Sequence, residues 1–200
     1  MPIGKGKGKG KGKSKSRGIA LQESFGTVVA KVVEVTEQEE QVKVDRVIIA
    51  VGPGFAVSPD GLKAQMGSGV YGLTAALYDE VSLNRGRISQ GNFDTYNMLR
   101  MPNAPVIETH IINSDANGGG AGKPSVPGTA PALTNAIYAA TGTRVRDLPV
   151  SKYEFDVEFR EENNLSSKSG IVVARASAML EIKLIEWLAQ GRCRSLFRCC

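Results

Sequence analysis

The residues best suited to chemistry lie in a glycine-rich segment, 115–124, directly before a stretch of small, helix-forming residues. Its glycines leave the backbone bare and open to positive φ, as suits a loop that passes close to a ligand: Gly118, Gly119, Gly120 and Gly122. The regular helix behind this loop is expected to begin near Pro131 and to end at Gly142, which suits a C-cap. Because a helix N-terminus attracts anions, the segment predicts a backbone cradle for phosphate or an oxyanion. The alternative is a flexible surface loop without a ligand.

One familiar phosphate-binding motif does not fit this loop. A P-loop requires G-x-x-x-x-G-K followed by Ser or Thr, whose hydroxyl binds magnesium. Lys123 does follow Gly122, but Asn117 occupies the position of the first glycine. Pro124 then replaces the hydroxyl residue. The sequence therefore excludes a P-loop nucleotide triphosphatase.

The other side chains that could do chemistry give weaker signals. His110 is the only histidine, and its apolar surroundings favour a position in a sheet over a catalytic role. Three carboxylates show no paired spacing, and solvent or turn roles are expected for them: Asp94, Glu108 and Asp115. The three cysteines fall within the last eight residues and match no zinc pattern. No metal site is therefore predicted, and a reducing compartment is the simpler assumption.

The elements that must position the glycine loop are strands and one helix. Residues 18–35 are strongly β-forming, with a bulge or a close backbone approach expected at Gly26. Residues 42–51 form the second strand of a hairpin. Residues 62–77 repeat apolar side chains every three or four positions and predict one helix, in which the Gln65 amide is available to a ligand. Residues 105–114 predict another strand, and Asn84-Arg85-Gly86 predicts a short hairpin. The predicted fold class is α/β, a mixed sheet with packed helices.

Three glycines interrupt the predicted helix over residues 62–77: Gly67, Gly69 and Gly72. Each costs about 1 kcal/mol relative to alanine inside a helix, so each requires a reason. Close packing against another backbone and contact with a large planar ligand are the two alternatives.

The net charge of +5 comes from the N-terminal segment, in which glycine and lysine alternate. Residues 1–17 hold seven of the 25 lysines and arginines and no acid, so the rest of the chain is near neutral. We expect residues 1–17 to be a disordered tail or linker, and nucleic-acid association through this tail is a weaker alternative. No basic face for specific nucleic-acid binding is predicted on the fold itself. The sequence shows no signal-peptide apolar segment and no run long enough for a membrane span.

Several ordered motifs resemble one enzyme family. They include Ala20-Leu-Gln-Glu-Ser-Phe-Gly26, Gly119-Gly-Ala-Gly122 and Ala130-Pro-Ala-Leu-Thr-Asn-Ala-Ile137, together with residues 55–61, 64–66, 72–78 and 104–108. In this order they are similar to the C-terminal part of the molybdopterin-binding subunit of the xanthine oxidase and aldehyde oxidase family. Within the family, the resemblance points to the group around the beta subunit of isoquinoline 1-oxidoreductase. It covers residues 18–153, and family subunits are several times longer.

The resemblance implies a cofactor, a reaction and site residues. The implied cofactor is molybdopterin, held by glycine-rich loops, with Gln65, Gly119, Gly120, Ala121 and Gly122 at cofactor-binding positions. The implied reaction is hydroxylation of an aldehyde or of a nitrogen heterocycle such as isoquinoline, with oxygen from water. The family has a glutamate base at the position of Lys123. Because lysine is a cation at neutral pH unless its pKa falls by several units, we expect Lys123 to be non-functional as a base and the chain to be impaired.

The resemblance also implies partners and a place in the cell. An iron-sulfur subunit and the remainder of the large subunit are expected partners, in the bacterial cytoplasm or periplasm. Residues 154–200 depart from the family and predict a divergent extension with one amphipathic helix over residues 170–189. Such an extension either docks a partner or is not native to the fold. The alternative to an enzyme fragment is a non-catalytic structural or binding fragment that keeps only the fold.

Overall fold

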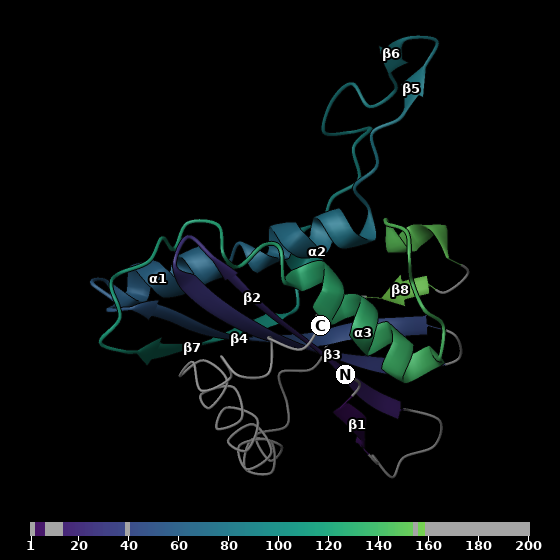
Figure 1. Ribbon diagram of the computed structural model, residues 1–200. Coiled ribbons are helices and arrows are strands. Elements are labelled where there is room, and N and C mark those ends of the chain that lie inside the picture. The colour runs from purple at the N-terminus through teal and green to yellow at the C-terminus, as the bar shows by residue number, and fades with distance from the viewer. Residues whose placement is uncertain (1–2, 7–13, 39–40, 154–155, 159–200) are drawn as a thin grey trace, which may run out of the picture.

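The computed structural model describes residues 3–6, 14–38, 41–153 and 156–158. Within these residues, six strands form one mixed sheet (Figure 1): β1 (Ile3–Gly6), β2 (Ser14–Ser24), β3 (Thr27–Gln38), β4 (Gln41–Gly54), β7 (Val106–Asn113) and β8 (Asp156–Glu158). The strands follow the order β1-β2-β3-β4-β7, and β8 also pairs with β4. Neighbours from β1 to β4 are antiparallel, whereas β7 and β8 run parallel to β4. The predicted mixed α/β class is confirmed.

Of the two alternatives expected at Gly26, the close backbone approach is confirmed, because a Cβ atom at Gly119 would lie 2.6 Å from the Gly26 carbonyl oxygen. The other alternative, a bulge within one strand, is wrong, because the chain turns there between β2 and β3. Phe25 and Gly26 both have positive φ, at 54° and 72°, and Ser24 pairs with Thr27 across them. Positive φ at both central residues is the requirement of a tight two-residue hairpin. Residues 18–35 therefore form parts of two antiparallel strands, and the hairpin predicted between residues 18–35 and 42–51 is the β3–β4 pair.

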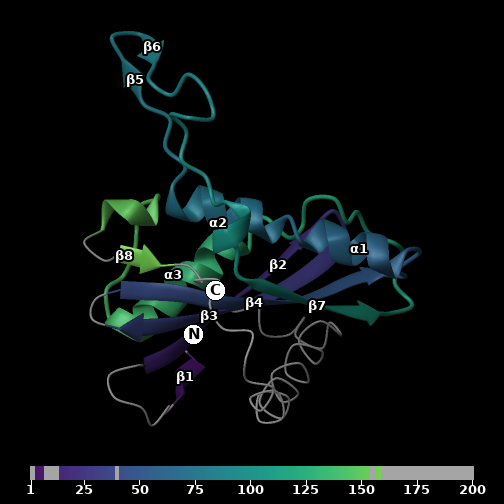
Figure 2. The same ribbon diagram turned by 180° about the vertical axis from the view of Figure 1, so that it is seen from behind.

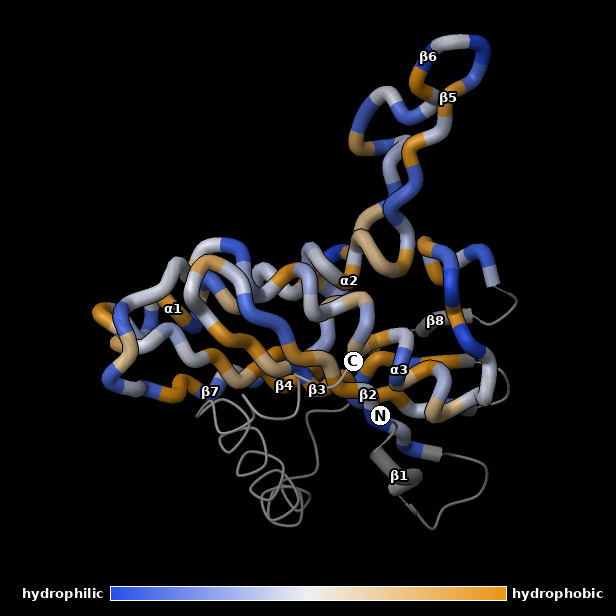
Figure 3. Tube along the Cα trace, viewed as in Figure 1, coloured by the Kyte–Doolittle hydropathy of each residue, from blue (hydrophilic) through white to orange (hydrophobic). Residues whose placement is uncertain are grey.

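Three helices pack on one face of the sheet (Figure 2): α1 (Pro59–Met66), α2 (Gly69–Leu77) and α3 (Thr129–Thr141). Val29, Val33 and Ile49 from the strands share one core cluster with Leu73 and Leu133 from the helices. The apolar colouring follows the strands through the middle of the sheet (Figure 3). Valine and isoleucine suit these strands because branched side chains pack well on a pleated surface.

The prediction of a single helix over residues 62–77 is wrong, because Gly67 and Ser68 interrupt the helix between α1 and α2. The Gly67 amide still donates to the Ala64 carbonyl at 3.1 Å, and a new helix begins at Gly69. Close packing against another backbone is the reason for Gly72. A Cβ atom at Gly72 would lie 2.8 Å from the Val126 carbonyl oxygen, so this helix approaches the segment before α3 directly.

The predicted helix end at Gly142 is confirmed. Gly142 has φ 77° and its amide donates to the Tyr138 carbonyl at 2.9 Å, which is the left-handed C-cap that glycine favours. The helix begins at Thr129, close to the start expected near Pro131.

A short hairpin arm projects from the end of α2, away from the sheet (Figures 1 and 2). Its strands are β5 (Leu83–Asn84) and β6 (Arg87–Ile88), joined by Arg85 and Gly86 at positive φ. The hairpin predicted from Asn84-Arg85-Gly86 is therefore confirmed. Two 3₁₀ helices, Met101–Asn103 and Val150–Lys152, complete the described elements.

The predicted domain boundaries, at residues 18 and 153, stay predictions. The sheet extends into the segment assigned to the tail, since β1 spans Ile3–Gly6 and β2 begins at Ser14. The strand β8 lies in the segment assigned to the extension, whereas the helix predicted over residues 170–189 lies outside the described residues. Among the described helices, none has the length and apolar character that a membrane crossing needs.

Gly18 sets how closely α3 approaches the sheet. A Cβ atom at Gly18 would overlap the backbone of α3 at Ala132 and Ala136 and would lie 2.8 Å from the Asn135 carbonyl carbon. Gly18→Ala is therefore expected to lower the free energy of unfolding by about 3 kcal/mol, because helix backbone cannot move aside as a flexible side chain can. Urea denaturation measures this loss. Gly91→Ala is the matched control, since no atom lies within 4 Å of its Cβ position, and equal stabilities for the two variants would contradict the packing argument.

Candidate functional site

The candidate site lies where the parallel strands β4 and β7 end. Gly54 and Asn113 pair at this edge, and the Ser114 amide donates to the Gly54 carbonyl at 2.9 Å. The Asn113 side chain accepts a hydrogen bond from the Ala56 amide at 3.3 Å, which ties together the loops that follow the two strands. In open α/β sheets, ligands bind outside the carboxyl ends of parallel strands. The glycine loop begins here, directly after β7.

The first half of the glycine loop packs on the β2–β3 turn. The Gly119 amide donates to the Pro53 carbonyl, and the Gly120 amide donates to the Phe25 carbonyl, both at 2.8 Å. A Cβ atom at Gly119 would lie 2.6 Å from the Gly26 carbonyl oxygen. The close approach of two backbones therefore requires a glycine at position 119. These two amides already have backbone acceptors, so they are not spare donors for an anion.

The glycines of this loop do not adopt the positive φ that is open to them. Among the described residues, the glycines with positive φ are Gly26, Gly54, Gly86 and Gly142, none of which belongs to the loop. Gly118 and Gly122 meet nothing within 4 Å of a built Cβ, so neither conformation nor packing requires glycine there.

The second half of the loop holds three consecutive backbone donors. Among the described residues, the backbone amides of Ala121, Gly122 and Lys123 have no hydrogen-bond acceptor. The Lys123 side chain is exposed, and its carbonyl accepts from the Val126 amide at 3.0 Å in the turn that leads to α3. Gly128 caps α3 without a side-chain hydrogen bond. Three consecutive amides and one ammonium group, placed before a helix N-terminus, are a donor set that suits an anionic group.

A buried lysine lies beneath the segment that follows Lys123. Lys31 in β3 is fully buried, and its amine donates to the Ser125 carbonyl and, at 2.5 Å, to the Thr129 hydroxyl. The Ser125 hydroxyl donates to the Met66 carbonyl at 2.7 Å, at the end of α1. Burial lowers the pKa of Lys31 from 10.5 to about 7, because the charged amine is removed from water. Gln22 in β2 adds a hydrogen bond from its side-chain amide to the Pro124 carbonyl.

Sequence reasoning missed Lys31, although a signal was present. Side chains alternate between the two faces of a strand, so residue 31 shares a face with Val29 and Val33, both of which enter the core. A lysine in that register is necessarily buried. Its partners Ser125 and Thr129 lie more than 90 positions away in the chain, and nothing local to Lys31 indicates them.

Gln65 lies on the exposed surface of α1. Its backbone carbonyl accepts from the Ser68 amide at 3.1 Å, where the helix breaks. Among the described residues, no hydrogen bond joins the Gln65 side chain to the glycine loop. The role of Gln65 towards a cofactor stays a prediction.

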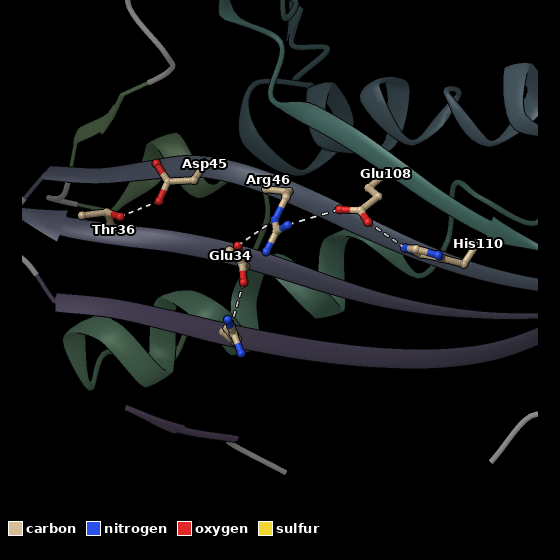
Figure 4. A network of polar contacts seen from close by, with 7 residues as sticks. Glu34, Thr36, Asp45, Arg46, Glu108 and His110 are labelled. Carbon is tan, nitrogen blue, oxygen red and sulfur yellow. Dashed lines mark hydrogen bonds and ion pairs between the residues drawn. The ribbon is translucent and has the colours of Figure 1, made fainter. Parts of the chain in front are cut away.

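His110 and Glu108 belong to an ion-pair ladder rather than to the loop (Figure 4). His110 contacts Glu108 at 2.9 Å, Glu108 contacts Arg46 at 3.2 Å, and Arg46 contacts Glu34 at 2.9 Å. Burial raises the pKa of Glu34, but the hydrogen bond and charge of Arg46 and the charge of Arg17 outweigh it, so the pKa lies below its usual range. These side chains cross the sheet on the face opposite the helices, since Glu34 alternates with the core residues Val33 and Val35. The predicted sheet position of His110 is confirmed.

Among the described residues, no three His, Cys, Asp or Glu side chains gather where they could hold a metal ion.

Comparison with known proteins gives the context of this site. The family of molybdopterin cofactor-binding domains matches residues 6–105. The chain is 35% identical over 136 residues to the isoquinoline 1-oxidoreductase subunit beta of Brevundimonas diminuta. These aligned residues cover 66% of this chain and 17% of that protein. It is 34% identical over 106 residues to a membrane-bound aldehyde dehydrogenase of Gluconacetobacter polyoxogenes, covering 52% of this chain and 14% of that protein.

Solved structures show the same fold at low sequence identity. Quinoline 2-oxidoreductase from Pseudomonas putida 86 aligns with a TM-score of 0.54 and 14% identity over 62% of this chain and 17% of its own. An aldehyde oxidoreductase from Desulfovibrio desulfuricans aligns with a TM-score of 0.53 and 19% identity over 62% of this chain and 14% of its own. The present chain therefore spans only a small part of the length of the proteins that it matches.

Proposed function

This chain belongs to the family of molybdopterin cofactor-binding domains, within the xanthine oxidase group, and from this premise we propose that it binds molybdopterin as part of a molybdenum hydroxylase. The observation that carries the proposal is the row of amides from Ala121 to Lys123 without acceptors, at the carboxyl edge of β4 and β7. Because this row lies beyond the matched residues 6–105, its role rests on geometry and on the resemblance of the surrounding motifs.

The donor set fits the anionic part of the cofactor. Backbone N–H groups before a helix N-terminus bind phosphate oxygens without sequence-specific side chains. The Lys123 ammonium adds a positive charge at the same point of the loop. When bound, the cofactor supplies a molybdenum centre that oxidises a substrate. The loop orients this group and keeps it against the sheet edge.

Lys123 favours cofactor binding but weakens the reaction. Hydroxylation with oxygen from water requires a group that accepts a proton, and an exposed ammonium has no lone pair to accept one. We therefore infer a domain that holds its cofactor and turns over slowly. Aldehydes and nitrogen heterocycles are the proposed substrate classes, and an iron-sulfur subunit and the rest of a large subunit are the proposed partners. A binding domain without catalysis is the second candidate, and Lys123 is the observation that favours it.

Cofactor content tests this proposal with a matched pair of variants. The full chain, purified from a host that makes molybdopterin, is expected to retain molybdenum and pterin at a near-stoichiometric level. Gly122→Asp places a carboxylate beside the unpaired amides and is expected to reduce both contents at least about tenfold, since like charges repel. Gly118→Asp is the control, because no atom lies within 4 Å of a Cβ built at either position and Gly118 lies outside the row from Ala121 to Lys123.

Metal analysis and fluorescence of the released pterin measure the two contents. A wild-type chain without pterin would overturn the binding proposal. Equal losses in the two variants would show that the second half of the loop has no special role.

A further inference from the structure

We propose that Lys31 is a positioning residue, whose amine fixes the segment from Pro124 to Thr129 on the sheet and thereby sets the place of the Ala121–Lys123 amides. The inference rests on the proposed function, because it concerns the segment that borders the cofactor site. It adds a residue from the middle of the sheet that lies beneath the loop and does not face a ligand.

The contacts of Lys31 bridge elements that no backbone ladder connects. Its amine donates to the Ser125 carbonyl and to the Thr129 hydroxyl, and the Ser125 hydroxyl lies 3.4 Å from the same nitrogen. The Thr129 hydroxyl in turn donates to the Ser125 carbonyl at 3.1 Å. One amine therefore contacts both ends of the turn that leads from the glycine loop into α3.

The surrounding backbone leaves room for this side chain. A Cβ atom at Gly69 would lie 3.2 Å from the Lys31 amine, and one at Gly128 would lie 3.7 Å from the Lys31 Cδ atom. A larger residue at Gly69 would press against the amine itself. The break between α1 and α2 and the cap of α3 thus both face Lys31.

A purely structural role would be better served by an apolar residue. A buried amine loses its hydration, and replacing a buried charge with an apolar residue of similar volume is often neutral or stabilising. The hydrogen bonds of Lys31 reach Ser125 and Thr129, both in the segment 124–129, which contains two prolines. The amine therefore contributes to the position of the turn more than to the stability of the fold. Lys31→Met separates the two contributions, because methionine keeps the length and removes every donor.

Amide hydrogen exchange of the full chain without cofactor tests the proposal. In Lys31→Met, the amides of Val126, Thr129 and Ala132 are expected to exchange at least about tenfold faster, because the turn loses its anchor. Core amides of β3 and β4 are expected to keep their rates, and the urea midpoint is expected to stay equal or rise. Val33→Ala is the control, since it removes core volume on the same strand face without touching the turn. It is expected to lower the urea midpoint and to leave the relative rates of the turn amides unchanged.

A second variant excludes a general loosening of the core. Thr129→Val removes one acceptor with little change of shape and is expected to speed exchange of the turn amides by itself. In the Lys31→Met background, its effect is expected to be smaller than in the wild type, because the bond to Lys31 is already gone and only the Thr129–Ser125 hydrogen bond is left to lose. Additive effects, or unchanged turn amides in Lys31→Met, would overturn the positioning role. These measurements need no cofactor, so an empty wild-type chain refutes the proposed function and leaves this result independent of it.

Discussion

Lys123→Glu is expected to raise the turnover of a chimeric subunit by about 10² to 10⁴. The chimera carries residues 14–153 of this chain in place of the matching stretch of the Brevundimonas diminuta isoquinoline 1-oxidoreductase subunit beta, and isoquinoline oxidation is measured. A glutamate at this exposed loop position is a carboxylate at neutral pH and can accept the proton that the lysine ammonium cannot. General-base assistance accounts for a rate difference of this size.

The control for this gain is Lys63→Glu, which makes the same charge change on the exposed surface of α1. Lys63 pairs with Asp60 at 3.9 Å and is far along the chain from the glycine loop, so turnover is expected to stay unchanged. Molybdenum content is measured in each chimera, so that rates are compared per loaded site. A Lys123→Glu chimera that is fully loaded and no faster than its parent would refute the assignment of the base position.

The stability of the wild-type chain is expected to increase as the pH rises from about 7 to about 10, and Lys31 is the cause. The pKa of its amine is lowered from 10.5 to about 7 in the folded protein, because the charged form loses its hydration there. Between these two values the unfolded chain binds more protons than the folded chain, so raising the pH favours the folded state. Below about pH 7 both states are protonated and the contribution is constant. The full change is on the order of 5 kcal/mol, since one pKa unit corresponds to about 1.4 kcal/mol.

Urea denaturation at a series of pH values measures this dependence. Lys31→Met is expected to remove it, so the difference between the wild type and the variant isolates Lys31 from the other titrating groups. Lys63→Met is the control, because it removes an amine that lies on the exposed surface of α1. A wild-type curve parallel to that of Lys31→Met from pH 7 to pH 10 would show that the amine keeps an ordinary pKa.

Local chemistry explains which parts of this fold could be predicted. The end of α3 at Gly142 and the hairpin at Asn84-Arg85-Gly86 depend on residues that adopt positive φ, and neighbours in the chain are enough to recognise them. The strand β7 and the helix that follows the glycine loop likewise follow from apolar patterns and prolines within a few positions. The resemblance to molybdopterin-binding subunits rested on motif order, which is also a property of the sequence alone.

Patterns of this kind failed where packing decided between alternatives. Apolar spacing favoured one helix across residues 62–77, but the helix is interrupted at Gly67. The close approach of α2 to the segment before α3 requires a glycine at position 72. The glycine at position 119 looked like a conformational requirement and is instead a steric one, imposed by the β2–β3 turn. Gly119 and the β2–β3 turn are far apart in the chain.

The sequence by itself determined the short hairpin at Asn84-Arg85-Gly86, the end of α3, the glycine loop with Lys123, and the family. Only the tertiary structure decided what supports the loop. It placed β7 beside β4 in a parallel pair and brought Lys31 to Ser125, a partner 94 residues away. The physical reason is that turns and caps are set by the conformation of a few adjacent residues, whereas the partner of a buried amine depends on which elements the core brings together.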